Sequence, residues 1–111
     1  MINVLVIKKN QTIKTIEATG HSGYAEHGED IVCSAISVLM ETLANGLTEV
    51  VKAEVKVLVD ETIPHISVTL TEKEQEKCKH AQVLMQSTLL GIKGVAQEFS
   101  KFIKIKEKQN D

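Results

Sequence analysis

Two stretches near the start of the chain have the hydrophobic pattern of β-strands. Residues 2–8 are almost wholly apolar, and residues 12–19 mix β-branched with polar side chains in partial alternation. Between them lies a polar break of hairpin length, Lys9-Asn10-Gln11. The pattern predicts an N-terminal β-hairpin.

A second pair of strands is predicted by cleaner alternation. From residue 53 to 59 every second position is apolar, which is the period of a half-buried strand: Ala53, Val55, Val57 and Val59. After a turn at 60–62 the alternation resumes, with Ile66, Val68 and Leu70 expected inward and His65, Ser67 and Thr69 outward. Pro64 indicates either an edge strand or a strand that begins there.

Helical spacing of apolar residues predicts two helices. The first runs from about Ile31 to Asn45 and is expected to end at Gly46, with an inner stripe of Val32, Ile36, Leu39 and Leu43. The second is expected to open with a capping box between Thr71 and Glu74. Its stripe has spacings of three or four throughout: Cys78, Ala81, Met85, Leu89, Ile92, Ala96 and Phe99. Gly91 and Gly94 interrupt this helix and suggest close packing against a neighbour.

These elements predict one small α+β domain over residues 1–106, with its helices packed on a mainly antiparallel sheet. The order is β-β-α-β-β-α, followed by a possible short strand at 102–106. Residues 107–111 look like a polar C-terminal tail.

Composition narrows the class of protein. The 111 residues carry 15 acidic and 13 basic side chains for a net charge of −2, and every basic one is Lys, so direct nucleic-acid binding is disfavoured. The longest charge-free stretches, 31–40 and 81–92, are too short to span a bilayer, and residues 1–7 do not resemble a signal peptide. Two cysteines are too few for a disulfide scaffold. We therefore expect a soluble cytoplasmic protein with reduced thiols and no membrane partner.

The segment between the first hairpin and the first helix breaks the hydrophobic pattern. Its eleven residues, 20–30, hold three glycines, two histidines and Tyr24. Loops of this length are often functional. We expect Gly23 and Gly28 to let residues 22–29 move as a lid that orders over a bound, extended peptide.

Cys33 follows this loop at the start of the first helix. If Asp30 is the N-cap, Cys33 occupies the third helical position, where the helix dipole favours a thiolate and the Asp30 charge partly opposes it. Ser37 lies one turn further on the same face. His21 stands at the end of a strand, where a rigid backbone can aim its ring across the loop. A thiol and an imidazole together form the minimal unit of nucleophilic acyl transfer, with helical N–H groups, including that of Cys33, available to an oxyanion.

Other interpretations of these residues are weaker. Cys78 lies on a core stripe and fits a buried structural cysteine, while His27, His65 and His80 fit solvated side chains. Tyr24 fits either a core position or a substrate contact. The spacing of His21, His27 and Cys33 matches no usual zinc site, so no metal or other cofactor is predicted. Gly20-His21-Ser22-Gly23 has the form of a nucleic-acid-binding GXXG loop, but acidic residues flank it.

The motif Gly20-His21-Ser22-Gly23-Tyr24-Ala25, with Gly28 and the run Asp30-Ile31-Val32-Cys33-Ser34-Ala35-Ile36-Ser37, resembles the Prp family of bacterial ribosomal-processing cysteine proteases (YsxB-like proteins). The likeness is densest over residues 20–37 and extends to element order and to residues 90–94. Ser22 and Ser34 stand where the family often has Ala, and neither departure removes a reacting group.

This resemblance implies an activity and a set of roles. Family members remove a short N-terminal extension from a large-subunit ribosomal protein, act in the bacterial cytoplasm and form homodimers. Carried over by position, Cys33 is the nucleophile and His21 its base, with Gly20, Asp30 and Ser37 as supporting residues and Gly23 and Tyr24 as candidate substrate contacts. The alternative is a non-catalytic, ribosome-associated binding module that uses the loop 20–30.

Overall fold

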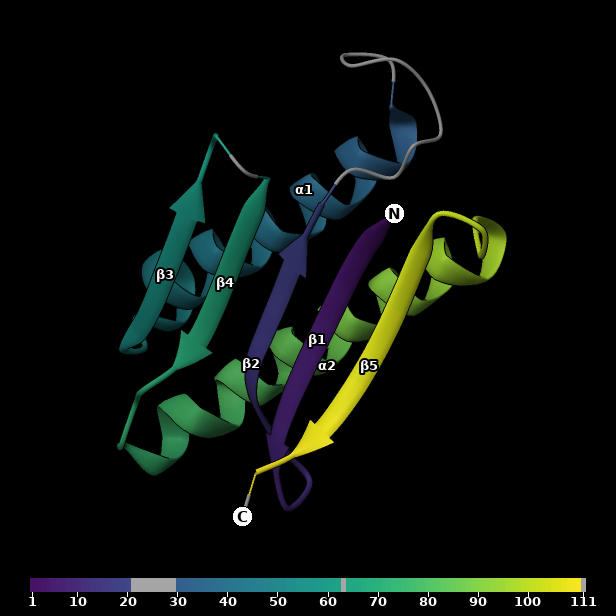
Figure 1. The fold of residues 1–111 in the computed structure, drawn as a ribbon. Helices are drawn as coiled ribbons and strands as arrows, with labels where there is room; N and C mark the ends of the chain where they lie inside the picture. Colours follow the sequence, from purple (N-terminus) through teal and green to yellow (C-terminus); the bar gives the residue numbers. More distant parts are fainter. Residues whose placement is uncertain (21–29, 63, 111) are drawn as a thin grey trace.

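The order of helices and strands is the one that the sequence predicts, including the final strand. The computed structural model describes residues 1–20, 30–62 and 64–110. Its elements are β1 (Ile2–Lys9), β2 (Thr12–Thr19), α1 (Ile31–Asn45), the π-helix η1 (Gly46–Val51), β3 (Val55–Asp60), β4 (His65–Leu70), α2 (Gln75–Glu98) and β5 (Ile103–Gln109) (Figure 1). The chain is a single α+β domain.

The five strands form one mixed sheet in the order β3-β4-β2-β1-β5. Neighbouring strands are antiparallel except β1 and β5, which run parallel because α2 carries the chain back along the sheet before β5 begins. β5 is longer than predicted, since Glu107–Gln109 pair with Val6–Lys8 and the Asn110 N–H donates to the Lys8 carbonyl oxygen at 2.7 Å. The expected tail at 107–111 is therefore mostly part of the sheet.

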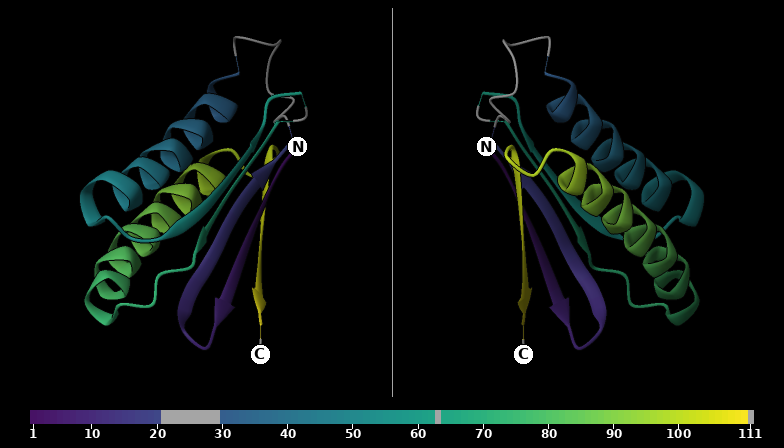
Figure 2. Two further views of the ribbon diagram at one scale, coloured as in Figure 1. Left: turned by 90° about the vertical axis from the view of Figure 1, so that its left-hand side faces the viewer. Right: turned by 90° about the vertical axis from the view of Figure 1, so that its right-hand side faces the viewer.

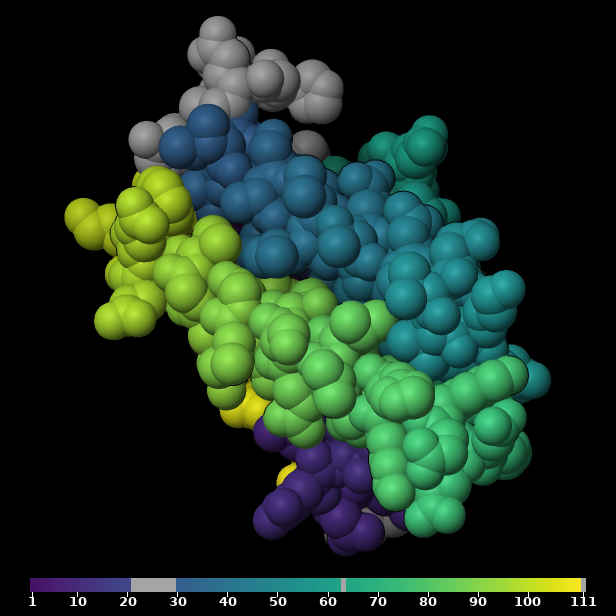
Figure 3. Space-filling view, turned by 180° about the vertical axis from the view of Figure 1, so that it is seen from behind, coloured from purple at the N-terminus to yellow at the C-terminus, as the bar shows by residue number. Residues whose placement is uncertain are grey.

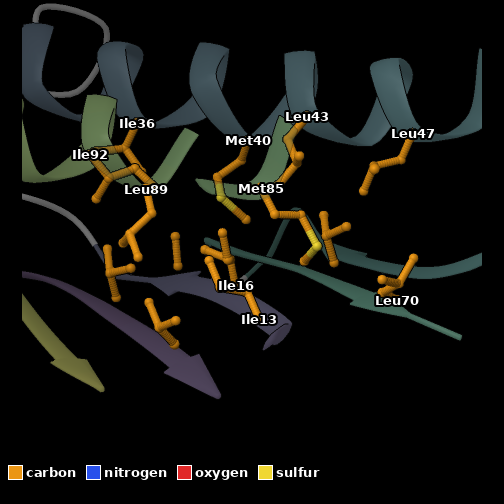
Figure 4. Close-up of a cluster of buried hydrophobic side chains, with 14 of the residues drawn as sticks. Ile13, Ile16, Ile36, Met40, Leu43, Leu47, Leu70, Met85, Leu89 and Ile92 are labelled. Carbon is orange, nitrogen blue, oxygen red and sulfur yellow. The ribbon is translucent and has the colours of Figure 1, made fainter. Parts of the chain in front are cut away.

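Both helices pack on one face of the sheet, so the fold has two layers (Figure 2). Figure 3 shows them side by side across that face. The core lies between the layers, where aliphatic side chains of both helices point toward the strands (Figure 4). Its largest fully buried members are Ile2, Ile13, Ile16, Met40, Leu43, Leu47, Met85 and Ile92. Among the described residues, no helix covers the other face of the sheet.

The bounds of the first α-helix, Ile31–Asn45, are as predicted, but Gly46 does not end the helical segment. Gly46 has helical dihedral angles (φ −62°, ψ −42°), and the chain continues through η1 to Val51. The left-handed residue that ends the helical segment is Lys52, with φ 58°. Leu47 is fully buried, so packing favours the extra turn over the glycine stop. Met40, rather than Leu39, completes the buried stripe of α1.

The start of the second helix also differs from its prediction. Thr71 and Glu74 form no capping box: the Thr71 N–H donates to the Glu54 carbonyl oxygen, and Glu74 caps α2 without a side-chain hydrogen bond. The Glu72 carboxylate instead accepts from the backbone N–H groups of Glu54, Lys73 and Glu74. The predicted stripe of α2 is confirmed from Ala81 onward, because Ala81, Met85, Leu89 and Ile92 are buried and Ala96 and Phe99 pack against the core. Cys78, at the start of the stripe, is only partly buried.

Side chains of the second hairpin differ from simple alternation. Val57 and Val59 are exposed on β3, which is an edge strand of the sheet. Ser67, which was expected to point outward, is buried. Pro64 directly precedes β4, which lies in the interior of the sheet. The prediction that Pro64 marks the start of a strand is therefore confirmed, and the alternative of an edge strand is wrong.

Gly91 lies where the helices approach closely, as predicted. A Cβ atom there would stand 3.2 Å from a methyl group of Leu39 on α1. Gly94 has open space around it, so close packing explains only the first of these glycines.

The helical segment Ile31–Val51 is longer than the charge-free stretch 31–40 considered from the sequence, and by length and composition it could cross a membrane. Its inner residues, however, are packed on the sheet as part of the core. A core helix of a soluble protein has the same composition.

Candidate functional site

The start of α1 has the capped geometry that the sequence predicts. Asp30 is the N-cap, and its Oδ1 accepts the backbone N–H of Cys33 at 2.9 Å. The Asp30 side chain is buried within this turn. The backbone carbonyl oxygen of Asp30 accepts hydrogen bonds from both the N–H and the hydroxyl of Ser34. Cys33 therefore occupies the third position of the helix and is held there by the Asp30 carboxylate.

Cys33 opens into a small groove of about 50 Å³ at one end of the sheet. Three strands and the helix meet there, and the lining residues come from all of them: Ile2, Ala18, Thr19, Gly20, Cys33, Ile36, Ser37, Pro64, His65 and Ile66. In Figure 1 this is the end at which β2 finishes, β4 begins and α1 starts. Of the predicted site residues, Gly20, Cys33 and Ser37 thus line the same groove, and Asp30 is hydrogen-bonded to Cys33.

Gly20 lines the groove and has a backbone conformation that other residues rarely adopt. Its φ is +92°, and a Cβ atom at this position would lie 2.5 Å from the carbonyl oxygen of Met1. Its N–H donates to the Pro64 carbonyl oxygen at 2.9 Å. Both the positive φ and the close approach of Met1 therefore require glycine at this position.

The pKa of the Cys33 thiol shifts in the direction opposite to the one expected from the helix dipole. Partial burial raises the pKa of the Cys33 thiol, the negative charge of Asp30 raises this pKa further, and a side-chain hydrogen bond with Ser37 lowers it. The first two effects prevail, so the net direction is upward. The position of Cys33 at a helix N-terminus therefore does not lower its pKa, because burial and the carboxylate of the N-cap residue raise it.

The expected role of the Cys33 N–H in oxyanion binding is also not supported by this geometry. That N–H donates to Asp30 Oδ1 and is therefore already paired. An oxyanion at the groove needs other donors, or a displacement of the Asp30 carboxylate.

Several predicted residues lie outside the described part of the chain. These are His21, Gly23, Tyr24 and His27, together with the proposed lid at 22–29. Among the other histidines, His80 is exposed as expected. His65 is not simply solvated, because its Nε2 lies 3.1 Å from Glu17 Oε2. Cys78 is partly buried, and its Sγ donates to the Glu72 carbonyl oxygen at 3.2 Å.

Sequence reasoning missed residues from distant segments that form the groove. Ile2 and Pro64 line the groove and Met1 lies against Gly20, and the local pattern around Met1 and Ile2 does not indicate a site. Pro64 alone gave a signal, as the start of a strand. In the described ranges 1–20, 30–62 and 64–110, no three His, Cys, Asp or Glu side chains are placed to hold a metal ion.

Comparison with known proteins gives consistent similarities over nearly the whole chain. The family model of the cysteine protease Prp matches residues 1–104. The ribosomal processing cysteine protease Prp of Bacillus subtilis (strain 168) is 21% identical over 94 residues, which are 84% of each chain. The crystal structure of an essential ribosomal processing protease Prp from S. aureus, in complex with a covalently linked product peptide, has a TM-score of 0.87 at 20% identity and covers 97% of this chain and 100% of that one. A crystal structure from Streptococcus mutans has a TM-score of 0.86 at 30% identity, covering 99% and 96%.

Proposed function

The chain belongs to the cysteine protease Prp family and is a cysteine protease, and on this premise we propose that Cys33 is its nucleophile and His21 its general base. We further propose that it removes a short N-terminal extension from a large-subunit ribosomal protein, as a homodimer in the bacterial cytoplasm. The name of its relatives, ribosomal processing protease, supports this substrate class. A solved relative, the Prp protease from S. aureus in complex with a substrate peptide, supports a peptide as the ligand.

The single observation that carries the assignment is the groove shared by Gly20 and Cys33. His21 is the next residue after Gly20, and consecutive Cα atoms are about 3.8 Å apart. Gly20 is fixed by its bond to Pro64 and by its contact with Met1. The fixed position of Gly20 in the groove lined by Cys33 supports His21, the next residue in the sequence, as the proposed base.

The raised pKa of Cys33 supports the need for a base. A thiol that keeps its proton near neutral pH is a poor nucleophile until a neighbouring group accepts that proton. In the proposed reaction His21 takes the proton, and the sulfur attacks the scissile carbonyl carbon. His21 then protonates the leaving amine, and water hydrolyses the thioester. Ser37 stabilises the thiolate through its hydrogen bond to Cys33, and Asp30 holds the helix start that carries the sulfur.

Two pairs of variants test this proposal on an extended ribosomal-protein precursor, with cleavage followed by mass spectrometry. Cys33→Ala is expected to abolish cleavage with little change in melting temperature, whereas Cys78→Ala, the matched control on α2, is expected to cleave. His21→Ala is likewise expected to be inactive, and His80→Ala active, because His80 is exposed on α2.

Cleavage by Cys33→Ala at the wild-type rate would overturn the assignment of the nucleophile. A wild-type protein that binds the precursor without cutting it would instead support the binding module that uses the loop 20–30.

A further inference from the structure

The two edges of the sheet differ in chemistry. On the outermost strand β5, Lys104, Lys106 and Lys108 are exposed on the face that the helices leave open. Lysines on an edge strand discourage pairing with another sheet. The opposite edge, β3, exposes three consecutive apolar side chains: Val57 is 37% exposed, Leu58 48% and Val59 61%. Figure 1 shows these strands at the two sides of the sheet. The β5 edge thus carries three lysines of the kind that discourage strand addition, whereas β3 carries one, Lys56, beside its apolar side chains.

The backbone of β3 is arranged to accept a further strand. Hydrogen bonds of an interior strand alternate between its two neighbours. The Gly20 N–H donates to the Pro64 carbonyl oxygen. The backbone N–H and C=O groups of even-numbered β4 residues therefore point toward β2, and those of odd-numbered residues point toward β3. Their partners in β3 are Lys56, Leu58 and Asp60. It follows that the backbone N–H and C=O groups of Val57 and Val59 point away from the sheet.

The side chains of β3 are complementary to a second copy of the same strand. If two β3 strands run antiparallel with Leu58 opposite Leu58, then Val57 faces Val59 of the second copy, and Lys56 faces Asp60. Both ion pairs form at once, because a two-fold axis repeats every contact. An axis at Val57 or at Val59 would instead place Leu58 opposite Lys56 or Asp60. The register at Leu58 is the one that satisfies charge and apolar contacts together.

We propose that β3 pairs with β3 of a second copy in this register, joining two five-stranded sheets into one sheet of ten strands. The inference rests on the homodimer included in the proposed function and assigns its surface. The Cys33 groove includes Pro64 and His65, at the hairpin end of β4. Antiparallel pairing therefore places the two grooves at opposite ends of the joined sheet, and neither is covered by the contact.

Sedimentation velocity at a fixed protein concentration tests the assignment. Val59→Lys is expected to weaken the dimer at least tenfold. Its matched control is Val83→Lys on α2, which changes an equally exposed valine (64%) and is expected to leave the dimer intact. Circular dichroism and melting temperature verify that both variants are folded.

Charge reversal gives a test that does not depend on one variant folding well. Lys56→Asp places Asp opposite Asp60, and Asp60→Lys places Lys opposite Lys56, so each variant alone is expected to be mainly monomeric. Asp60 also accepts from Thr62 within its own turn, so the second variant loses this contact as well. When the two are mixed, both cross-strand pairs become opposite in charge, and a heterodimer is expected.

Each result has a defined meaning. A monomeric wild-type protein would overturn both the homodimer and this surface. It would not affect the assignment of Cys33 and His21, which precursor cleavage tests separately. A wild-type dimer that Val59→Lys does not weaken, or two charge variants that fail to combine, would overturn the β3 assignment alone. A Val59→Lys protein that stays dimeric but has a raised KM for the precursor would place substrate, rather than a second copy, on this edge and would also overturn it.

Discussion

The Asp30 carboxylate that caps α1 is hydrogen-bonded to the N–H of Cys33 at 2.9 Å, and its charge raises the pKa of the thiol of the same residue. One side chain therefore stabilises the helix and opposes ionisation of the proposed nucleophile. The two effects need different properties of Asp30, since capping requires an oxygen acceptor and the electrostatic effect requires a charge.

Asp30→Asn separates these properties. Asn is a comparably good N-cap, so the melting temperature is expected to change little. Removal of the negative charge lowers the pKa of Cys33, so alkylation by iodoacetamide should begin at lower pH than in the wild-type protein. Asp30→Ala, which also removes the cap, is expected to cost about 0.5–2 kcal/mol of stability. An alkylation profile of Asp30→Asn that matches the wild type would contradict this account of the thiol.

Ser37→Ala is expected to shift the same alkylation profile in the opposite direction. The hydrogen bond with Ser37 lowers the pKa of Cys33, so its loss raises that pKa and delays thiolate formation to higher pH. Ser37 is exposed, and the free energy of unfolding should change by no more than about 0.5 kcal/mol. Ser34→Ala is the control, because the Ser34 hydroxyl donates to the Asp30 carbonyl oxygen and not to the sulfur.

The stability of the wild-type protein is expected to fall slightly at alkaline pH. The pKa of Cys33 is raised in the folded state, so the folded chain retains a proton that the unfolded chain has already lost. This contribution is complete below the ordinary thiol pKa and is lost as pH rises through the folded value. Urea unfolding of wild type and Cys33→Ala across this range measures it. The fall should be smaller in the variant, and equal slopes would exclude Cys33 as its source.

Gly20→Ala is expected to destabilise the protein by about 1–3 kcal/mol, because the residue has a strongly positive φ. The added Cβ would also collide with the Met1 carbonyl oxygen, so the groove that Gly20 lines has to rearrange and cleavage should fall. Gly94→Ala on α2 is the matched control, since it has open space and normal helical geometry. It is expected to stabilise the protein by about 1 kcal/mol. If Gly20→Ala had the stability and activity of the wild type, the requirement for glycine at position 20 would be contradicted.

Elements with strong local patterns were predictable. The apolar stripe of α2 and the first hairpin depend on the spacing of neighbouring side chains, which the chain displays directly. The same holds for Asp30 as N-cap of Cys33, because that hydrogen bond spans only three residues. The wrong predictions arose where distant contacts prevailed over local preference. Gly46 stays helical because Leu47 is buried, and Glu72 replaces the expected capping box because the Glu54 N–H lies beside it.

The amino-acid sequence by itself determined the kind of elements, their order and the segment in which the reactive residue types are concentrated, because all of these depend on short-range spacing. Only the tertiary structure decided that β5 lies parallel beside β1, that Met1 and Pro64 fix Gly20, and that β3 is an edge strand with exposed apolar side chains. These features depend on which distant strands become neighbours, and that choice follows from burying the apolar faces of the whole chain together.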